Sequence, residues 1–243
     1  MNTAISRLFR WQPSQETLVA VAAGVVVLGL SYAMIPVKDW PWITVAIRDI
    51  GQIFLVGILF PLVFMQHSGE GWAEYGLSFR KWPLFLSINL ALGSVLFFLF
   101  LSESPPPADF QLDVPRVWVA AFVMLALCFE VVFFYAFLRT VLERAFGIMP
   151  AIILTALFYA FHHVGFQPEY GKLTLVGLMY ATLYRLGNSA LLIFPFFLGV
   201  GGAYDVLVQS HVVEPVLYPE VRTSYLAAAI LTTAIWFWKI TKR

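Results

Sequence analysis

The chain has 243 residues, of which 60% are hydrophobic and only 12% are charged, whereas a typical soluble protein carries roughly 25% charged residues. This composition argues against a soluble protein and predicts one integral membrane domain over residues 1–243. The net charge of +1 argues against a nucleic-acid partner.

Apolar segments recur along the whole chain. Taking about 20 apolar residues as the length of one span, we predict an all-α membrane bundle of about eight transmembrane helices. Their approximate ranges are 17–35, 43–65, 82–101, 115–146, 149–163, 173–184, 189–208 and 224–238. Residues 103–113 are too rich in proline and polar side chains to be helical.

Basic residues gather at one side of this predicted bundle. Cytoplasmic loops carry an excess of Lys and Arg, so we expect both termini to be cytoplasmic and the protein to be a multi-pass protein of the cell membrane. Ten of the fifteen Lys and Arg residues would lie on that side: Arg7, Arg10, Arg80, Lys81, Arg139, Arg144, Arg185, Lys239, Lys242 and Arg243.

Glu130 is the first candidate functional residue, because an ionisable side chain inside the bilayer costs about 2.5–3.5 kcal/mol and usually has a functional role. At about 1.5 Å per residue, Glu130 lies roughly 18 Å above the inner end of its helix, which we place near Leu142. By the same rise His162 lies roughly 20 Å and Asp205 roughly 24 Å above that side. We therefore expect these three side chains to share one layer of the membrane.

A carboxylate that faces an imidazole in a partly dry cavity can act as a general base and activate water. Successive helical residues point about 100° apart. We therefore expect only one of His162 and His163 to face Glu130 and the other to face the outer interface. A purely structural Glu–His pair is the alternative interpretation.

Several other polar and small residues are interpreted structurally. Arg48 and Asp49 are expected to pair with each other at the membrane interface, and Cys128, the only cysteine, is expected to pack in the core. Three glycines of the seventh span are expected to allow close helix packing: Gly199, Gly201 and Gly202.

Three stretches between residues 72 and 206 together form a recognisable pattern. They are Tyr75-Gly76-Leu77 followed by Arg80-Lys81-Trp82; Glu130 followed by Phe134, Phe137-Leu138, Leu142 and Phe146-Gly147; and Phe158-Tyr159-Ala160-Phe161-His162. The pattern resembles the CPBP intramembrane proteases, also described as type II CAAX-prenyl-endopeptidase or abortive-infection-like proteins. That family has a Glu-Glu-x-x-x-Arg motif, a Phe-x-x-x-His motif and, on a later helix, a His-x-x-x-Asn motif.

The resemblance implies that Glu130 is the general base for peptide-bond hydrolysis within the membrane and that His162 holds or polarises the attacking water. The family's second glutamate and its arginine, which look like an ion pair bracing the helix, are replaced here by Val131 and Tyr135.

The third family motif falls on the predicted span 189–208, which contains no histidine. Asp205 stands near the place of the family's asparagine, but a carboxylate donates a hydrogen bond to an oxyanion only when it is protonated. The candidates to replace the third-motif groups are His163, Asp205 and His211, of which His211 is expected in an outer loop.

These observations leave three hypotheses. The first is a glutamate-dependent intramembrane endopeptidase that acts on a membrane-anchored peptide or protein in the lipid bilayer. No cofactor is expected, because one carboxylate and one or two histidines fall short of a secure zinc site. The second is a catalytically silent relative that binds or scaffolds another membrane protein, and the third is a small transporter. The oligomeric state is left open.

Overall fold

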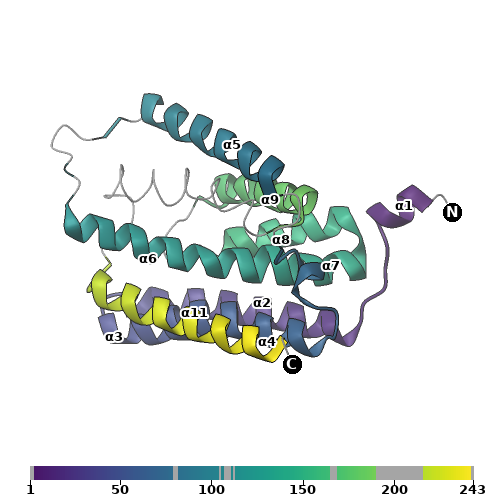
Figure 1. Cartoon of the computed structure of the whole chain (residues 1–243), viewed down its shortest axis with the longest axis horizontal. Coiled ribbons are helices and arrows are strands. Elements are labelled where there is room, and N and C mark those ends of the chain that lie inside the picture. Colours follow the sequence, from purple (N-terminus) through teal and green to yellow (C-terminus); the bar gives the residue numbers. More distant parts are fainter. Residues whose placement is uncertain are drawn as a thin grey trace.

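The computed structural model describes residues 3–78, 82–103, 105–106, 111, 113–164, 169–189 and 216–241. Within these ranges every regular element is helical and no strand occurs. The predicted all-α class is therefore confirmed. Figure 1 shows a bundle of long helices in which the N-terminal α1 lies at one end.

The chain up to residue 75 forms two long helical segments. After the short α1 (Thr3–Leu8), α2 (Gln15–Met34) begins at Ser14, whose hydroxyl accepts from the Thr17 backbone N–H and so satisfies an end group of the helix. The second segment is nearly continuous and includes a π-helical stretch. It consists of α3 (Pro41–Thr44), the π-helical η2 (Val45–Leu59) and α4 (Phe60–His67). The short η1 (Ile35–Val37) continues the first segment, and the short η3 (Trp72–Tyr75) follows the second.

The second half is built around one long rod that consists of α6 (Val114–Glu130), the π-helical η4 (Val131–Leu138) and α7 (Arg139–Phe146). Helix α5 (Trp82–Glu103) precedes the rod, and α8 (Ile148–His162), α9 (Tyr170–Gly187) and α11 (Pro219–Thr241) follow it. Helix α8 packs on α7 and α9, and α11 packs on α6 and η2.

Four helical segments of the described chain are long and apolar enough to cross a membrane. They are Gln15–Val37, Pro41–His67, Trp82–Glu103 and Val114–Phe146, and Ile148–His162 is a shorter apolar helix. These segments indicate a membrane protein. The sixth and eighth predicted spans are also helical, as α9 and α11. The seventh, with its three glycines, lies outside the described residues, so the total of eight spans and the orientation of the termini stay predictions.

The core of the bundle lies along η4. All of its residues except Val132 are buried, because helices pack on every side of it. Five large aromatic side chains fill this region: Phe129, Phe133, Phe134, Tyr135 and Phe137. Cys128 is only half-buried, but it packs against this core as expected. A segment covered all round cannot slide against one neighbour without disturbing the others, so η4 is a rigid platform for the residues at its ends.

A single glycine makes the turn between α7 and α8. Gly147 has φ = +89°, a backbone conformation that residues other than glycine rarely adopt. A β-carbon placed there would lie 2.6 Å from the backbone oxygen of Leu8. The N-terminal segment reaches the same turn, because the Arg10 N–H donates to the Phe146 carbonyl at 3.0 Å. Gly147 thus ends the long rod, as the sequence predicts, and also makes room for the chain's beginning.

Gly147→Ala is therefore expected to destabilise the fold by about 2 kcal/mol, through backbone strain and the clash with Leu8. Thermal unfolding of the purified protein in detergent measures this effect. Gly29→Ala is the matched control, because a β-carbon at Gly29 in α2 meets nothing within 4 Å, and its effect should stay within about 1 kcal/mol. Equal unfolding temperatures for the two variants would contradict this account of the turn.

Candidate functional site

Glu130 and the two histidines lie at the ends of neighbouring helices. Glu130 is the last residue of α6, directly before η4, and His162 is the last residue of α8. Because α8 packs against both η4 and α7, the end of α8 is held beside Glu130. All three side chains, Glu130, His162 and His163, are buried.

The three side chains converge on one point. Glu130 Oε1 lies 3.4 Å from His162 Nε2 and 3.7 Å from His163 Nε2. One potential metal-binding atom from each of the three side chains lies within 4.8 Å of the other two. The sequence prediction that Glu130 and His162 meet at one depth is thus matched by the geometry. Glu130 Oε2 has no hydrogen-bond partner among the described residues, so it can accept a hydrogen bond from a substrate or a water molecule.

The expectation that only one histidine faces Glu130 is wrong. It assumed that the direction of each Cα–Cβ bond decides where the imidazole points. Both Nδ1 atoms instead turn back to the Tyr159 carbonyl, three and four residues earlier in the chain. The side-chain conformations therefore bring both rings to the same carboxylate.

One carbonyl group orients both imidazole rings. The Tyr159 carbonyl oxygen lies 2.5 Å from His162 Nδ1 and 2.8 Å from His163 Nδ1. A carbonyl oxygen only accepts hydrogen bonds, so the protons are assigned to both Nδ1 atoms. The last carbonyls of a helix lack partners within the helix, and here the two side chains supply them. Each Nε2 atom then points its lone pair, in the neutral form, at Glu130.

This arrangement places three electron-rich atoms together in an apolar setting. Phe129 and Phe134 lie against the His162 ring, with centroids 5.6 Å and 4.7 Å away, and Tyr159 lies 4.8 Å from the His163 ring. Facing lone pairs repel more strongly where water is excluded. A shared proton or a cation between the groups relieves the repulsion, so the site is suited to holding either one.

The donor set also fits a divalent metal ion. Catalytic zinc sites use three protein ligands, such as two histidines and one glutamate, and keep a further position for water. Here His162 Nε2, His163 Nε2 and the Glu130 carboxylate would be the ligands, and the Tyr159 carbonyl provides the outer hydrogen bonds that such histidines need. A bound ion would polarise a carbonyl group or a water molecule.

The remaining site candidates lie outside the described residues. These are Asp205 and His211, so the structure neither adds them to the Glu130 site nor separates them from it. Val131 and Tyr135 are both buried in the core, so the interior is tightly packed at that level of the rod.

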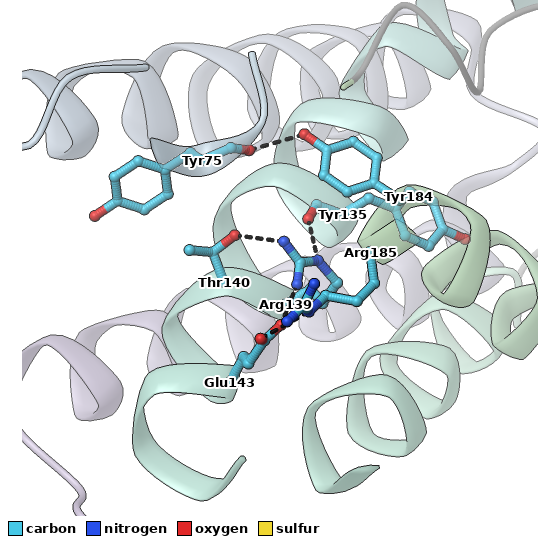
Figure 2. Close-up of polar contacts among 7 residues, drawn as sticks. All are labelled: Tyr75, Tyr135, Arg139, Thr140, Glu143, Tyr184 and Arg185. Atoms are coloured by element: carbon cyan, nitrogen blue, oxygen red, sulfur yellow. Dashed lines mark hydrogen bonds and ion pairs between the residues drawn. The ribbon is translucent and has the colours of Figure 1, made fainter. Parts of the chain in front are cut away.

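A buried ion network braces the rod one turn further along (Figure 2). Arg139 forms an ion pair with Glu143, and its guanidinium also donates to the Tyr135 carbonyl at 3.0 Å and to the Thr140 hydroxyl at 2.9 Å. Arg185 of α9 binds the second oxygen of Glu143 at 2.7 Å. The network therefore ties the rod to α9, a role that the sequence analysis did not assign to these residues.

The loop before α5 is anchored to the same region. Tyr184 of α9 donates its hydroxyl proton to the Tyr75 carbonyl at 2.8 Å (Figure 2). The Arg139 guanidinium lies 5.3 Å from the centre of the Tyr184 ring. Arg139 and Glu143 are four residues apart on one helix, and this spacing is the sequence pattern from which their ion pair could have been predicted.

The partner and the location of Asp49 differ from those predicted from the sequence. Its side chain has 0% exposure, and its carboxylate accepts from Arg222 Nε at 2.6 Å, from Arg222 Nη2 at 2.7 Å and from the Tyr225 hydroxyl at 2.5 Å. Arg222 lies in the first turn of α11, because this helix begins at Pro219. Asp49 thus links η2 to α11 in the protein interior instead of forming a couple with Arg48 at the interface.

Comparison of the chain with protein-family models, curated proteins and solved structures found no match. The resemblance to the CPBP proteases therefore stays a prediction that rests on the quoted residues alone.

The ion network predicts an unequal response to two substitutions. Glu143→Ala leaves the Arg139 guanidinium, which is 3% exposed, without its carboxylate and should destabilise the protein by about 3 kcal/mol. Arg185→Ala removes a partner whose side chain is 39% exposed, and solvent compensates, so its cost should stay below about 1 kcal/mol. Thermal unfolding in detergent distinguishes them, and a larger loss for Arg185→Ala would refute this ranking.

Proposed function

We propose that this protein is a glutamate-dependent intramembrane endopeptidase of the CPBP type that cleaves a membrane-anchored peptide or protein. The observation that carries the proposal is the convergence of one buried carboxylate and two oriented imidazoles at Glu130, His162 and His163. The proposal includes an eight-span topology, cytoplasmic termini and location in the cell membrane.

In the proposed reaction Glu130 removes a proton from a water molecule, and the resulting hydroxide adds to the carbonyl carbon of the scissile peptide bond. The C–N bond then breaks, and the proton held by Glu130 passes to the departing amine. The products are a carboxylic acid, which keeps the second proton of the water, and an amine; they become a carboxylate and an ammonium group when that proton passes to the amine, and the carboxylate of Glu130 is restored. General-base catalysis of this kind contributes roughly 10²–10⁴-fold to a rate.

In this reaction the two histidines would bind the attacking water and stabilise the negative charge that develops on the substrate. An Nε2 atom of His162 or His163 can accept a hydrogen bond from the attacking water and so hold it against Glu130. If one imidazole is protonated, the same atom donates to the oxygen on which negative charge develops. The Tyr159 carbonyl keeps both rings in the required orientation. The apolar walls formed by Phe129 and Phe134 strengthen these electrostatic interactions.

A catalytically silent scaffold is the competing proposal. The observation that favours it is the replacement of the family's ion pair by Val131 and Tyr135, both fully packed in the core. In a scaffold the Glu130 cluster would be a structural polar contact only. Substitutions that preserve shape but remove the base therefore distinguish the two functions.

Glu130→Gln is expected to reduce cleavage at least about 100-fold, because the amide keeps the shape of the side chain but cannot take a proton from water. The purified protein is incubated in liposomes with a membrane-protein extract, and new peptide N-termini are counted by mass spectrometry. Unfolding temperature is recorded in parallel, so that loss of the fold is recognised. New termini that appear at the same rate with Glu130→Gln would refute the proposed base.

His162→Gln and His163→Gln are each expected to slow the same cleavage by at least about tenfold, since each removes one of the two imidazoles that hold water and substrate charge. His67→Gln is the matched control, because His67 is an exposed histidine whose Nδ1 contacts only its own helix, at the Val63 carbonyl. It should leave the rate unchanged. A loss of cleavage shared equally by all three variants would point to a nonspecific effect and count against the assigned roles.

Metal dependence is decided by a separate measurement. With Glu130 acting as the base, cleavage should be unchanged after dialysis against a chelator, and zinc in the purified protein should be well below one ion per chain by elemental analysis. The opposite result, cleavage lost on chelation and restored by zinc, would make Glu130 a metal ligand. That result would replace the proposed role of Glu130 while leaving hydrolysis itself intact.

A further inference from the structure

A second site lies between the start of η2 and the start of α11, and one of its lining residues, Arg48, also acts electrostatically on Glu130. A cavity of about 380 Å³ is lined there by residues of the α2–η2 connection, of η2 itself and of the first turns of α11. Figure 1 shows α3 and the beginning of α11 at the same end of the bundle. Pockets that bind small molecules have volumes of about 300–1,000 Å³, so the cavity has room for a ligand the size of a lipid head group.

The polar part of the cavity wall is cationic. Lys38, Arg48 and Arg222 line it, and none of its described lining residues is acidic. Asp49 lies directly behind the wall, where its carboxylate is bound by Arg222 and Tyr225. Among the described lining residues, cationic side chains therefore outnumber acidic ones. This excess favours an anionic ligand.

Arg222 is held rigidly while it lines the cavity. Its guanidinium makes a two-point contact with Asp49, and its Cζ lies 4.5 Å from the centre of the Phe122 ring. Arg48 Cζ lies 5.8 Å from the centre of the same ring. One buried aromatic ring is therefore in contact with two guanidinium groups, an arrangement in which positive charge is concentrated in an apolar wall.

The rest of the wall is apolar and aromatic. The rings of Trp42 and Tyr218 stack 5.9 Å apart at an interplanar angle of 10°, and both side chains are exposed. Tryptophan and tyrosine at the ends of apolar helices lie at the depth of lipid head groups. Val45 and Val221 supply aliphatic surface beside them. Cations and aliphatic side chains thus meet in one cavity at the expected membrane interface.

We propose that this cavity binds the phosphate head group of an anionic phospholipid. Lys38 and Arg48 contact the phosphate, Arg222 fixes the cationic wall through Asp49, and the Trp42–Tyr218 stack covers the glycerol and the first carbons of the acyl chains. An inorganic phosphate ion shares the charge but would leave the apolar part of the wall without a partner. The proposal is independent of hydrolysis at Glu130.

Native mass spectrometry of the detergent-solubilised full chain tests the proposal. Phosphatidylglycerol is expected to remain bound at least about tenfold more than phosphatidylcholine with the same acyl chains, because only the former has a net negative charge. Lys38→Gln combined with Arg48→Gln should weaken phosphatidylglycerol binding by about thirtyfold, at the usual contribution of a cation near an anionic lipid surface. Lys38→Gln alone changes an exposed side chain and should weaken it about fivefold.

Arg116→Gln is the matched control, because Arg116 lies in the first turn of α6 and does not line the cavity. It should bind phosphatidylglycerol as the parent does. Equal binding of the two lipids, or unchanged binding by the Lys38 and Arg48 variants, would overturn the proposal. Inorganic phosphate should not displace the lipid at equal concentration, and displacement would reassign the cavity to a free anion.

Discussion

The need to pair charged side chains inside an apolar bundle determines how this protein is put together. An isolated charge in such an interior is expensive, and three acidic side chains each meet partners from another helix. Glu130 meets two histidines at the end of α8, Glu143 meets Arg185 of α9, and Asp49 meets Arg222 of α11. Each pairing fixes the position of one helix relative to another.

These contacts explain why the Glu130 site has a defined geometry. The rod formed by α6, η4 and α7 is buried along η4 and braced just beyond it by Arg139 and Glu143. The end of α8 is then held against it by packing and by the glycine turn at Gly147. Because Glu130 directly precedes the rigid part of the rod, its carboxylate is held in place beside the two imidazoles. π-helical segments such as η4 often adjoin functional sites in helices.

The sequence was informative where the free-energy cost of placing a residue in a membrane depends on its residue type alone. Apolar runs located the helices, and a lone carboxylate at depth identified Glu130, since both signals depend on hydrophobicity alone. It failed where the backbone or a distant partner decides. The predicted direction of the His163 ring was wrong because its hydrogen bond to the Tyr159 carbonyl cannot be seen in the sequence. The predicted partner of Asp49 was wrong because Arg222 lies 173 residues away. The predicted place of Asp205 falls outside the described residues.

The central claim is that Glu130 and His162 act as one catalytic unit, and a double-mutant cycle on the cleavage rate tests it most directly. Glu130→Gln, His162→Gln and the double variant are compared with the parent protein under identical conditions. Residues that work as a unit give strongly non-additive losses, so the double variant should be no slower than the slower single variant. Rate losses that multiply would show two independent residues and contradict the account.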